Sequence, residues 1–169
     1  MRSRFLKEHF PEFVAPMMAS VVKEPFDGPD WIFETKLDGY RAIAVIDATG
    51  KARIWSRNYL PLEPKFPTFA NPVNQLNLRS TILDGEIVAL DKDGIPRFQL
   101  LQQWQKRPTA PIVFFLFDLL WCDGRDLTTK TVVQRRKSRN ILEPCYWAHT
   151  ETDDYAISVT PVPGSAKRA

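Results

Sequence analysis

Cysteine and long apolar runs are both scarce in this 169-residue sequence. The two cysteines, Cys122 and Cys145, lie far apart and outside any C-x-x-C spacing, so the sequence indicates neither a disulfide framework nor a cysteine zinc site. The longest apolar run, residues 111–121, contains Asp118 and is too short to cross a bilayer. The amino terminus has no signal-peptide hydrophobic region. We therefore expect a protein of a reducing cytoplasm that is neither secreted nor inserted into a membrane.

An excess of one charge sign is also weak. The formal net charge is +3 and the pI is about 8.9, which permits contact with nucleic acid or nucleotide phosphates but does not establish it. No P-loop pattern and no internal repeat occurs. Hydrophobic residues make up 44% of the chain and aromatic residues 12%, which predicts one folded globular domain with a sizeable core.

The stretch from Trp31 to Ile46 predicts two short strands that meet at Asp38-Gly39, because Asp-Gly is a strong tight-turn signal. Lys36 would project from the end of the first strand, where an amine can serve as a nucleophile. Freeing the amine at pH 7 costs roughly 4 to 5 kcal/mol, from a pKa of about 10.4. Burial or a second cation such as Arg41 lowers that cost. The alternative is an ordinary hairpin with a solvated lysine.

A third strand, residues 52–55, is followed by Ser56-Arg57-Asn58. Arg57 would share a pocket with Lys36 if this strand lies close to the lysine. The alternative is an exposed turn arginine.

A fourth strand, residues 81–90, carries two carboxylates. The period of two predicts that Asp84 and Glu86 lie on one face of the strand with Ile82 and Val88. Carboxylates on an apolar face are costly to bury unless they bind a cation or hydrogen-bond donors. The alternative is a strand face open to water.

The run from Pro111 to Trp121 predicts a central strand that is covered on both faces. Alternation places Phe115 and Phe117 on one face, where an aromatic ring can either pack in the core or stack on a nucleobase. Helical spacing predicts further helices within residues 60–78, 98–105 and 127–142. Beyond Pro144 no periodicity remains, which indicates a poorly packed tail.

Four segments together resemble the successive motifs of ATP-dependent DNA ligases in order and spacing. The resemblance is strongest to the ligase module of bacterial multifunctional end-joining repair ligases and extends from about Phe13 to Arg136. The first motif alone, K-x-D-G-x-R, is shared with RNA ligases and capping enzymes. The segments are Lys36-Leu-Asp38-Gly39-Tyr-Arg41, Ser56-Arg57-Asn58, Leu83-Asp84-Gly85-Glu86-Ile-Val, and Phe114 to Gly124.

The resemblance implies a role for each matched residue. Lys36 would be the catalytic residue that attacks the α-phosphate of ATP and forms lysyl-AMP. The expected cofactors are ATP and Mg²⁺, or Mn²⁺ in its place. The nucleotide-binding residues would be Glu34 at the adenine edge, Arg41 and Arg57 at ribose or phosphates, Glu86 at the ribose or the metal, and Phe117 against the adenine ring.

The resemblance also implies a fold, and this sequence departs from the family's pattern at several places. It implies an α+β, ATP-grasp-like nucleotidyltransferase domain of mainly antiparallel sheets flanked by helices. Residues 1–136 would form part of this adenylation domain, and residues 137–169 an unrelated, poorly ordered tail. Tyr59 stands where the family usually has glycine. We expect the family's later glutamate motif, its paired-lysine strand and its OB-fold domain to be missing.

The expected function is ATP-dependent sealing of nicked DNA in repair or recombination, impaired by the missing segments. Its partners would be nicked or broken double-stranded DNA and other end-joining repair proteins, in a bacterial cytoplasm near the nucleoid. Two alternatives stay open. One is a nucleotidyltransferase or ligase for RNA ends, and the other is a non-catalytic remnant that binds nucleotide or DNA.

Overall fold

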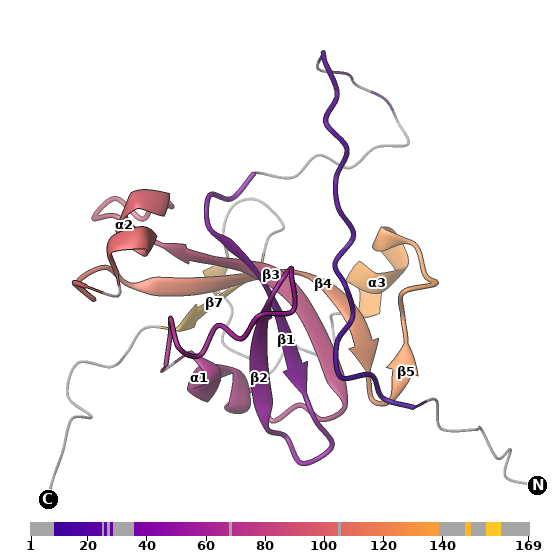
Figure 1. Ribbon diagram of the computed structural model, residues 1–169. Coiled ribbons are helices and arrows are strands. Elements are labelled where there is room, and N and C mark those ends of the chain that lie inside the picture. Colours follow the sequence, from indigo (N-terminus) through magenta and orange to yellow (C-terminus); the bar gives the residue numbers. More distant parts are fainter. Residues whose placement is uncertain are drawn as a thin grey trace, which may run out of the picture.

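The protein is built around one antiparallel sheet, seen in a computed structural model that describes residues 9–24, 26, 28, 36–67, 69–104, 106–138, 148–149 and 155–159 (Figure 1). The order of the strands is β2-β1-β3-β4-β7-β6, and β5 pairs with β4 outside this path. The strands are β1 Tyr40–Ile46, β2 Ala52–Ser56, β3 Thr81–Ala89, β4 Ile112–Cys122, β5 Arg125–Asp126, β6 Ala148–His149 and β7 Tyr155–Val159. The helices are α1 Ala70–Asn74, α2 Phe98–Gln103 and α3 Val132–Ser138.

The structure confirms four predicted strands as β1, β2, β3 and β4, within one or two residues at each end. The strand predicted over residues 31–35 lies outside the described residues. The helices predicted within 60–78 and 127–142 are shorter than their ranges, because α1 has five residues and α3 has seven. Repeated prolines account for the short α1, since a proline removes a backbone donor and restricts the residue before it.

The range that we predicted as a poorly ordered tail contains two short strands, β6 and β7. The backbone of β7 pairs with β4, from Ile112 opposite Val159 to Leu116 opposite Tyr155. The remainder of residues 139–169 lies outside the described residues. Strand β4 therefore pairs with β3 on one side and β7 on the other, which confirms the predicted central position in the sheet.

The main hydrophobic core covers one face of the sheet. Alternate residues of β1, β2, β3 and β4 point into it, including Ala44, Leu83 and Phe114. Helices α1 and α2 contribute Val73 and Leu101, which are buried against the same face. This packing fixes which side chains of each strand must point the other way.

The opposite face is covered in part by the extended amino-terminal segment, which Figure 1 shows in indigo crossing the sheet near β4. Phe10 and Phe13 of this segment pack with Ile43, Ile82 and Trp121. The Phe10 and Trp121 rings meet edge to face with their centroids 6.0 Å apart. The rest of this face carries the charged residues of the candidate site. Within the described residues, no helix is long and apolar enough to cross a bilayer.

Candidate active site

The backbone that carries Lys36 lies directly over β3. A Cβ atom added at Gly39 would lie 2.1 Å from the carbonyl oxygen of Ile87, so only glycine allows this approach. Positive φ among the described glycines occurs at other positions. The Asp-Gly pair therefore serves close packing, and Gly39 does not have the positive φ that is common in tight Asp-Gly turns. The Gly39 N–H donates a hydrogen bond to the Glu86 carboxylate, and the Lys36 side chain, although exposed, acts electrostatically on that same carboxylate.

Arg41 is held in one position by a buried carboxylate. Its Nε and Nη2 atoms donate hydrogen bonds to the two carboxylate oxygens of Asp84, and both donor–acceptor distances are 2.6 Å. Asp84 is 1% exposed. Burial raises the pKa of Asp84 and the contacts with Arg41 oppose that rise, but a two-point contact with a guanidinium needs an ionised carboxylate. Asp84 is therefore a fixed anchor for Arg41.

Glu86 lies beside Arg41 in the register, since β1 pairs with β3 at these two residues. Burial raises the pKa of Glu86 to about 7, although Arg41, the Gly39 N–H and Lys36 all act to lower it. The side chain is only half-buried. Glu86 therefore exchanges its proton near neutral pH, and a cation that binds there would displace that proton.

Phe117 occupies a bulge in β4. Gly85 pairs with Leu116 and Asp84 pairs with Asp118, so Phe117 is the extra residue between them. Its ring is half-buried and outside the core clusters. The guanidinium carbon of Arg41 lies 4.4 Å from the centroid of the ring. Phe117 thus presents an aromatic surface beside a fixed cation, which is a suitable environment for a nucleobase and its phosphates.

Arg57 directly follows β2, at the end of that strand that lies beside Arg41. Ser56 is the last residue of β2 to pair with β1, and it lies opposite Ala42, so the chain enters the Arg57 loop beside this end of β1. The side chain of Arg57 is exposed. Tyr59 in the same loop has a φ of 58°, in the left-handed region that favours glycine. Its ring lies 4.7 Å from that of Phe13 and 4.5 Å from that of Trp55, and these contacts offset the strain of the tyrosine backbone.

The structure brings together most of the residues that the sequence singled out. Lys36, Arg41, Glu86 and Phe117 gather on or beside the polar part of one sheet face, and Arg57 follows the neighbouring strand. Asp84 is confirmed on the face of Glu86, because Leu83 and Ile87 point into the opposite core. Glu34, the predicted adenine contact, lies outside the described residues.

Sequence reasoning missed one ion pair near this site. Asp118 of β4 binds Arg135 of α3 through two hydrogen bonds, of 2.7 and 2.6 Å. Arg135 is 4% exposed, and its bond with Asp118 raises the pKa of the guanidinium. The available signal was a lone carboxylate in the most apolar strand, which needs a cation when it is buried.

One expected cofactor, Mg²⁺, is compatible with the side chains that are present. The described residues contain no group of three or more His, Cys, Asp or Glu side chains that would hold a metal ion by themselves. Magnesium, however, is usually bound through one or two carboxylates together with substrate phosphates. Among the described residues of the site, Glu86 is a carboxylate available for that arrangement, whereas Asp84 is engaged by Arg41.

Comparison with known proteins agrees with this geometry. The family described as "ATP dependent DNA ligase domain" matches residues 16–156. The multifunctional non-homologous end joining protein LigD of Pseudomonas aeruginosa is 37% identical over 131 residues, which are 77% of this chain and 15% of that protein. The SPbeta prophage-derived DNA ligase-like protein LigB of Bacillus subtilis is 30% identical over 78% of this chain and 48% of its own length. The chain therefore spans less than half of either relative.

Solved structures show the same likeness. The crystal structure of the ligase domain from M. tuberculosis LigD is similar with a TM-score of 0.58 and 32% identity, over 66% of this chain and 36% of that chain. A mycobacterial DNA ligase D complexed with ATP and MES is similar with a TM-score of 0.57 over the same shares. The likeness covers 36% of each of these solved chains.

Proposed function

Because the chain belongs to the ATP-dependent DNA ligase domain family, we propose that it transfers AMP from ATP to Lys36 as the first step of DNA joining. The nitrogen of the neutral Lys36 amine attacks the α-phosphate, a P–N bond forms, the bond from the α-phosphate to pyrophosphate breaks, and the nitrogen releases a proton to solvent. The product is a lysyl-AMP phosphoramidate. The observation that carries this proposal is the gathering of Lys36, Arg41, Glu86 and Phe117 at one sheet face.

The other residues bind the nucleotide around this reaction. Arg41 and Arg57 contact ribose or phosphates and offset the negative charge that grows as pyrophosphate leaves. Phe117 stacks on the adenine ring, and Glu34 lies at the adenine edge. A related mycobacterial ligase D has been solved with ATP, which supports ATP as the nucleotide.

Glu86 has two alternative roles in this proposal. It holds the ribose hydroxyls or contributes to an Mg²⁺ or Mn²⁺ site together with the ATP phosphates. When bound, the metal ion supplies positive charge that stabilises the departing phosphates. The raised pKa of Glu86, about 7, means that binding of a cation there would release a proton near neutral pH.

The substrate that follows lysyl-AMP is nicked or broken double-stranded DNA. In the second step AMP passes from Lys36 to a 5′-phosphate at the break. In the third step a 3′-hydroxyl attacks that phosphate and displaces AMP, which joins the strands. The name of the Pseudomonas relative includes non-homologous end joining, which supports end-joining repair proteins as partners. We further propose that the chain works in a bacterial cytoplasm near the nucleoid.

The test of the substrate compares DNA and RNA ends at the second step. Protein loaded with labelled AMP is mixed with a nicked DNA duplex or with a matched nicked duplex that has an RNA 5′-phosphate strand. We expect transfer of labelled AMP to the DNA nick, and no loading of the Lys36→Ala variant. Faster transfer to the RNA end would favour the RNA-ligase alternative. Lysyl-AMP that transfers to neither end would contradict DNA joining by this polypeptide.

A further inference from the structure

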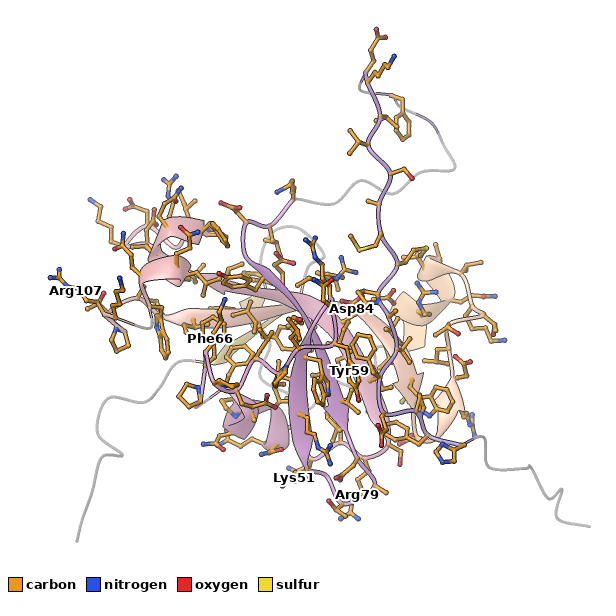
Figure 2. The ribbon with its side chains drawn as sticks, in the orientation of Figure 1. Lys51, Tyr59, Phe66, Arg79, Asp84 and Arg107 are labelled. Carbon is orange, nitrogen blue, oxygen red and sulfur yellow. The ribbon has the colours of Figure 1, made fainter. Side chains whose placement is uncertain are left out.

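Two carboxylates face each other on neighbouring strands, on the same face of the sheet as the proposed nucleotide site. Asp84 of β3 pairs directly with Asp118 of β4, and Figure 2 shows Asp84 in the middle of the sheet. Like charges opposite each other on neighbouring strands destabilise a sheet. The Asp84 and Asp118 side chains are 2% and 16% exposed, so water screens this repulsion poorly. Each carboxylate therefore requires a cation of its own.

The two cations come from different elements. Arg41 of β1 binds Asp84 through both carboxylate oxygens, and Arg135 of α3 binds Asp118 in the same way. Arg135 also donates through Nη1 to the carbonyl oxygen of Lys130. The result is a row of alternating partners, Arg41–Asp84 and Asp118–Arg135, in which each charge also acts on the neighbouring pair.

The start of α3 fixes Arg135 in this row. Thr131 and Gln134 form reciprocal bonds, from Gln134 N–H to the Thr131 hydroxyl and from Thr131 N–H to the Gln134 side chain. This is a capping box, which defines where a helix begins. Arg135 follows in the first turn, where its backbone N–H bonds to the Thr131 carbonyl, and its side chain is directed at β4.

We propose that Arg135 is a positioning residue for the nucleotide site, because it occupies Asp118 and so leaves Arg41 committed to Asp84 and Phe117. The proposal rests on the proposed function only where it says that Arg41 contacts the nucleotide. Arg41 is the cation most able to respond to Asp118, since its side chain is 30% exposed and it already interacts with the Asp118 charge. An unpaired Asp118 would be a largely buried, uncompensated carboxylate, and such a group attracts the nearest cation.

The first test observes Arg41 without any nucleotide. The Nε–H group of Arg41 gives an NMR signal in ¹⁵N-labelled protein that reports its hydrogen bond to Asp84, and the signal is assigned with Arg41→Lys. Arg135→Gln should shift this signal and increase its exchange with water, because Arg41 turns toward Asp118. The double variant Asp118→Asn/Arg135→Gln should return the signal to its wild-type position, since the competing charge is gone.

The second test measures ATP affinity in the same variants. Arg135→Gln should weaken ATP binding about tenfold, as expected for one misplaced charge-assisted contact. The double variant should recover to within about threefold of wild type, well inside that tenfold change. If Arg135 only packs α3 against the sheet, both variants lack the same guanidinium, and the double variant will bind no better than the single one.

The outcomes separate this inference from the proposed function. The inference is supported if Arg135→Gln shifts the Arg41 signal and the double variant returns it to the wild-type position, whether or not the wild type binds ATP. Absence of ATP binding by the wild type would count against the nucleotide site alone. An unchanged Arg41 signal in Arg135→Gln, or a double variant as perturbed as the single one, would overturn it. Should Arg135→Gln fail to fold by circular dichroism, Arg135→Met carries the test. Its unbranched side chain fills irregular space in a core but carries no charge and no hydrogen-bond donor for Asp118, so the same shift and the same rescue by Asp118→Asn are expected.

Discussion

Asp84 and Glu86 lie two residues apart on the same face of β3, yet their surroundings give them different tasks. Asp84 accepts two hydrogen bonds from Arg41 and is almost fully buried. Glu86 is half-buried, and its neighbours do not offset the effect of burial on its pKa. One carboxylate therefore positions a cation, whereas the other is able to gain or lose a proton near neutral pH.

Glu86→Gln should change how stability depends on pH. The pKa of Glu86 is about 7 in the folded protein and about 4.3 in an unfolded chain. The folded state therefore holds a proton that the unfolded state has released between these pH values, so wild-type stability falls as pH rises from about 4.3 to 7. Glutamine does not titrate. The free energy of unfolding of the variant, relative to that of wild type, should therefore rise by about 1–2 kcal/mol between pH 4.5 and 8, a value reduced for partial exposure of Glu86.

Urea unfolding of both proteins at pH 4.5 and pH 8 measures this difference. Asp93→Asn, in the exposed turn after β3, is the control for removing one carboxylate. A difference between wild type and Glu86→Gln that stays the same at both pH values would show that Glu86 ionises alike in the folded and unfolded states.

Phe117→Leu should affect nucleotide binding more than stability. The ring is half-buried, belongs to no core cluster and lies against Arg41. We expect ATP binding to weaken about threefold to tenfold, which corresponds to about 0.5–1.5 kcal/mol of aromatic stacking. Phe114→Leu is the matched control from the core side of β4, where the ring is fully buried, and it should lower stability by about 1–2 kcal/mol.

Thermal unfolding and nucleotide titration on both variants separate the two roles. If Phe117→Leu loses as much stability as Phe114→Leu while its affinity for ATP is unchanged, Phe117 is a core residue and leaves the nucleotide site.

At the scale of elements, two of the three Asp-Gly pairs of the motifs, at Gly39 and Gly85, serve strand packing. A Cβ at Gly85 would lie 2.3 Å from the carbonyl oxygen of Phe115, as a Cβ at Gly39 would collide with Ile87. Both glycines thus let neighbouring segments approach β3 and β4 closely. The sequence signalled a glycine requirement at Gly39 but suggested a turn as its cause, because composition does not distinguish a positive φ from a close approach.

The loop after β2 offers a direct test of backbone strain. Tyr59 has a φ of 58°, which costs a residue with a Cβ about 1–2 kcal/mol relative to glycine. Tyr59→Ala and Tyr59→Gly both remove the ring contacts with Phe13 and Trp55, but only glycine relieves the strain. Tyr59→Gly should therefore be more stable than Tyr59→Ala by about 1 kcal/mol. Equal stabilities, or a more stable alanine variant, would show that the loop does not hold this conformation.

Periodicity predicted the strands well, but it did not predict the partner of Asp118 or the bulge at Phe117. The strands β1, β3 and β4 have alternating or continuous apolar sequences that match a sheet packed on one or both faces. The partners of Asp118 and the bulge at Phe117 depend on which strands lie side by side and in which register. Sequence separation hides such contacts, as between Asp118 and Arg135, so they emerge only from the folded sheet.

At the scale of the whole molecule, chain order and strand order together assemble the site. Lys36 and Arg41 belong to β1 or its approach, Arg57 follows β2, Glu86 lies in β3 and Phe117 in β4. These four strands are adjacent, in the order β2-β1-β3-β4, with every pairing between them antiparallel. Four motifs spread along the sequence therefore meet at one face, which explains why the motifs taken together carried more information than any one of them.

The most direct measurement of the central claim is the transfer of AMP to Lys36 itself. The purified chain is incubated with Mg²⁺ and ATP labelled at the α-phosphate, or in parallel with NAD labelled in its adenylate. Peptide mapping then locates the label, and Lys36→Arg is the control that keeps the charge. We predict label from ATP on the peptide that contains Lys36 and none in the control. Label on another lysine, or label from NAD alone, would contradict the account.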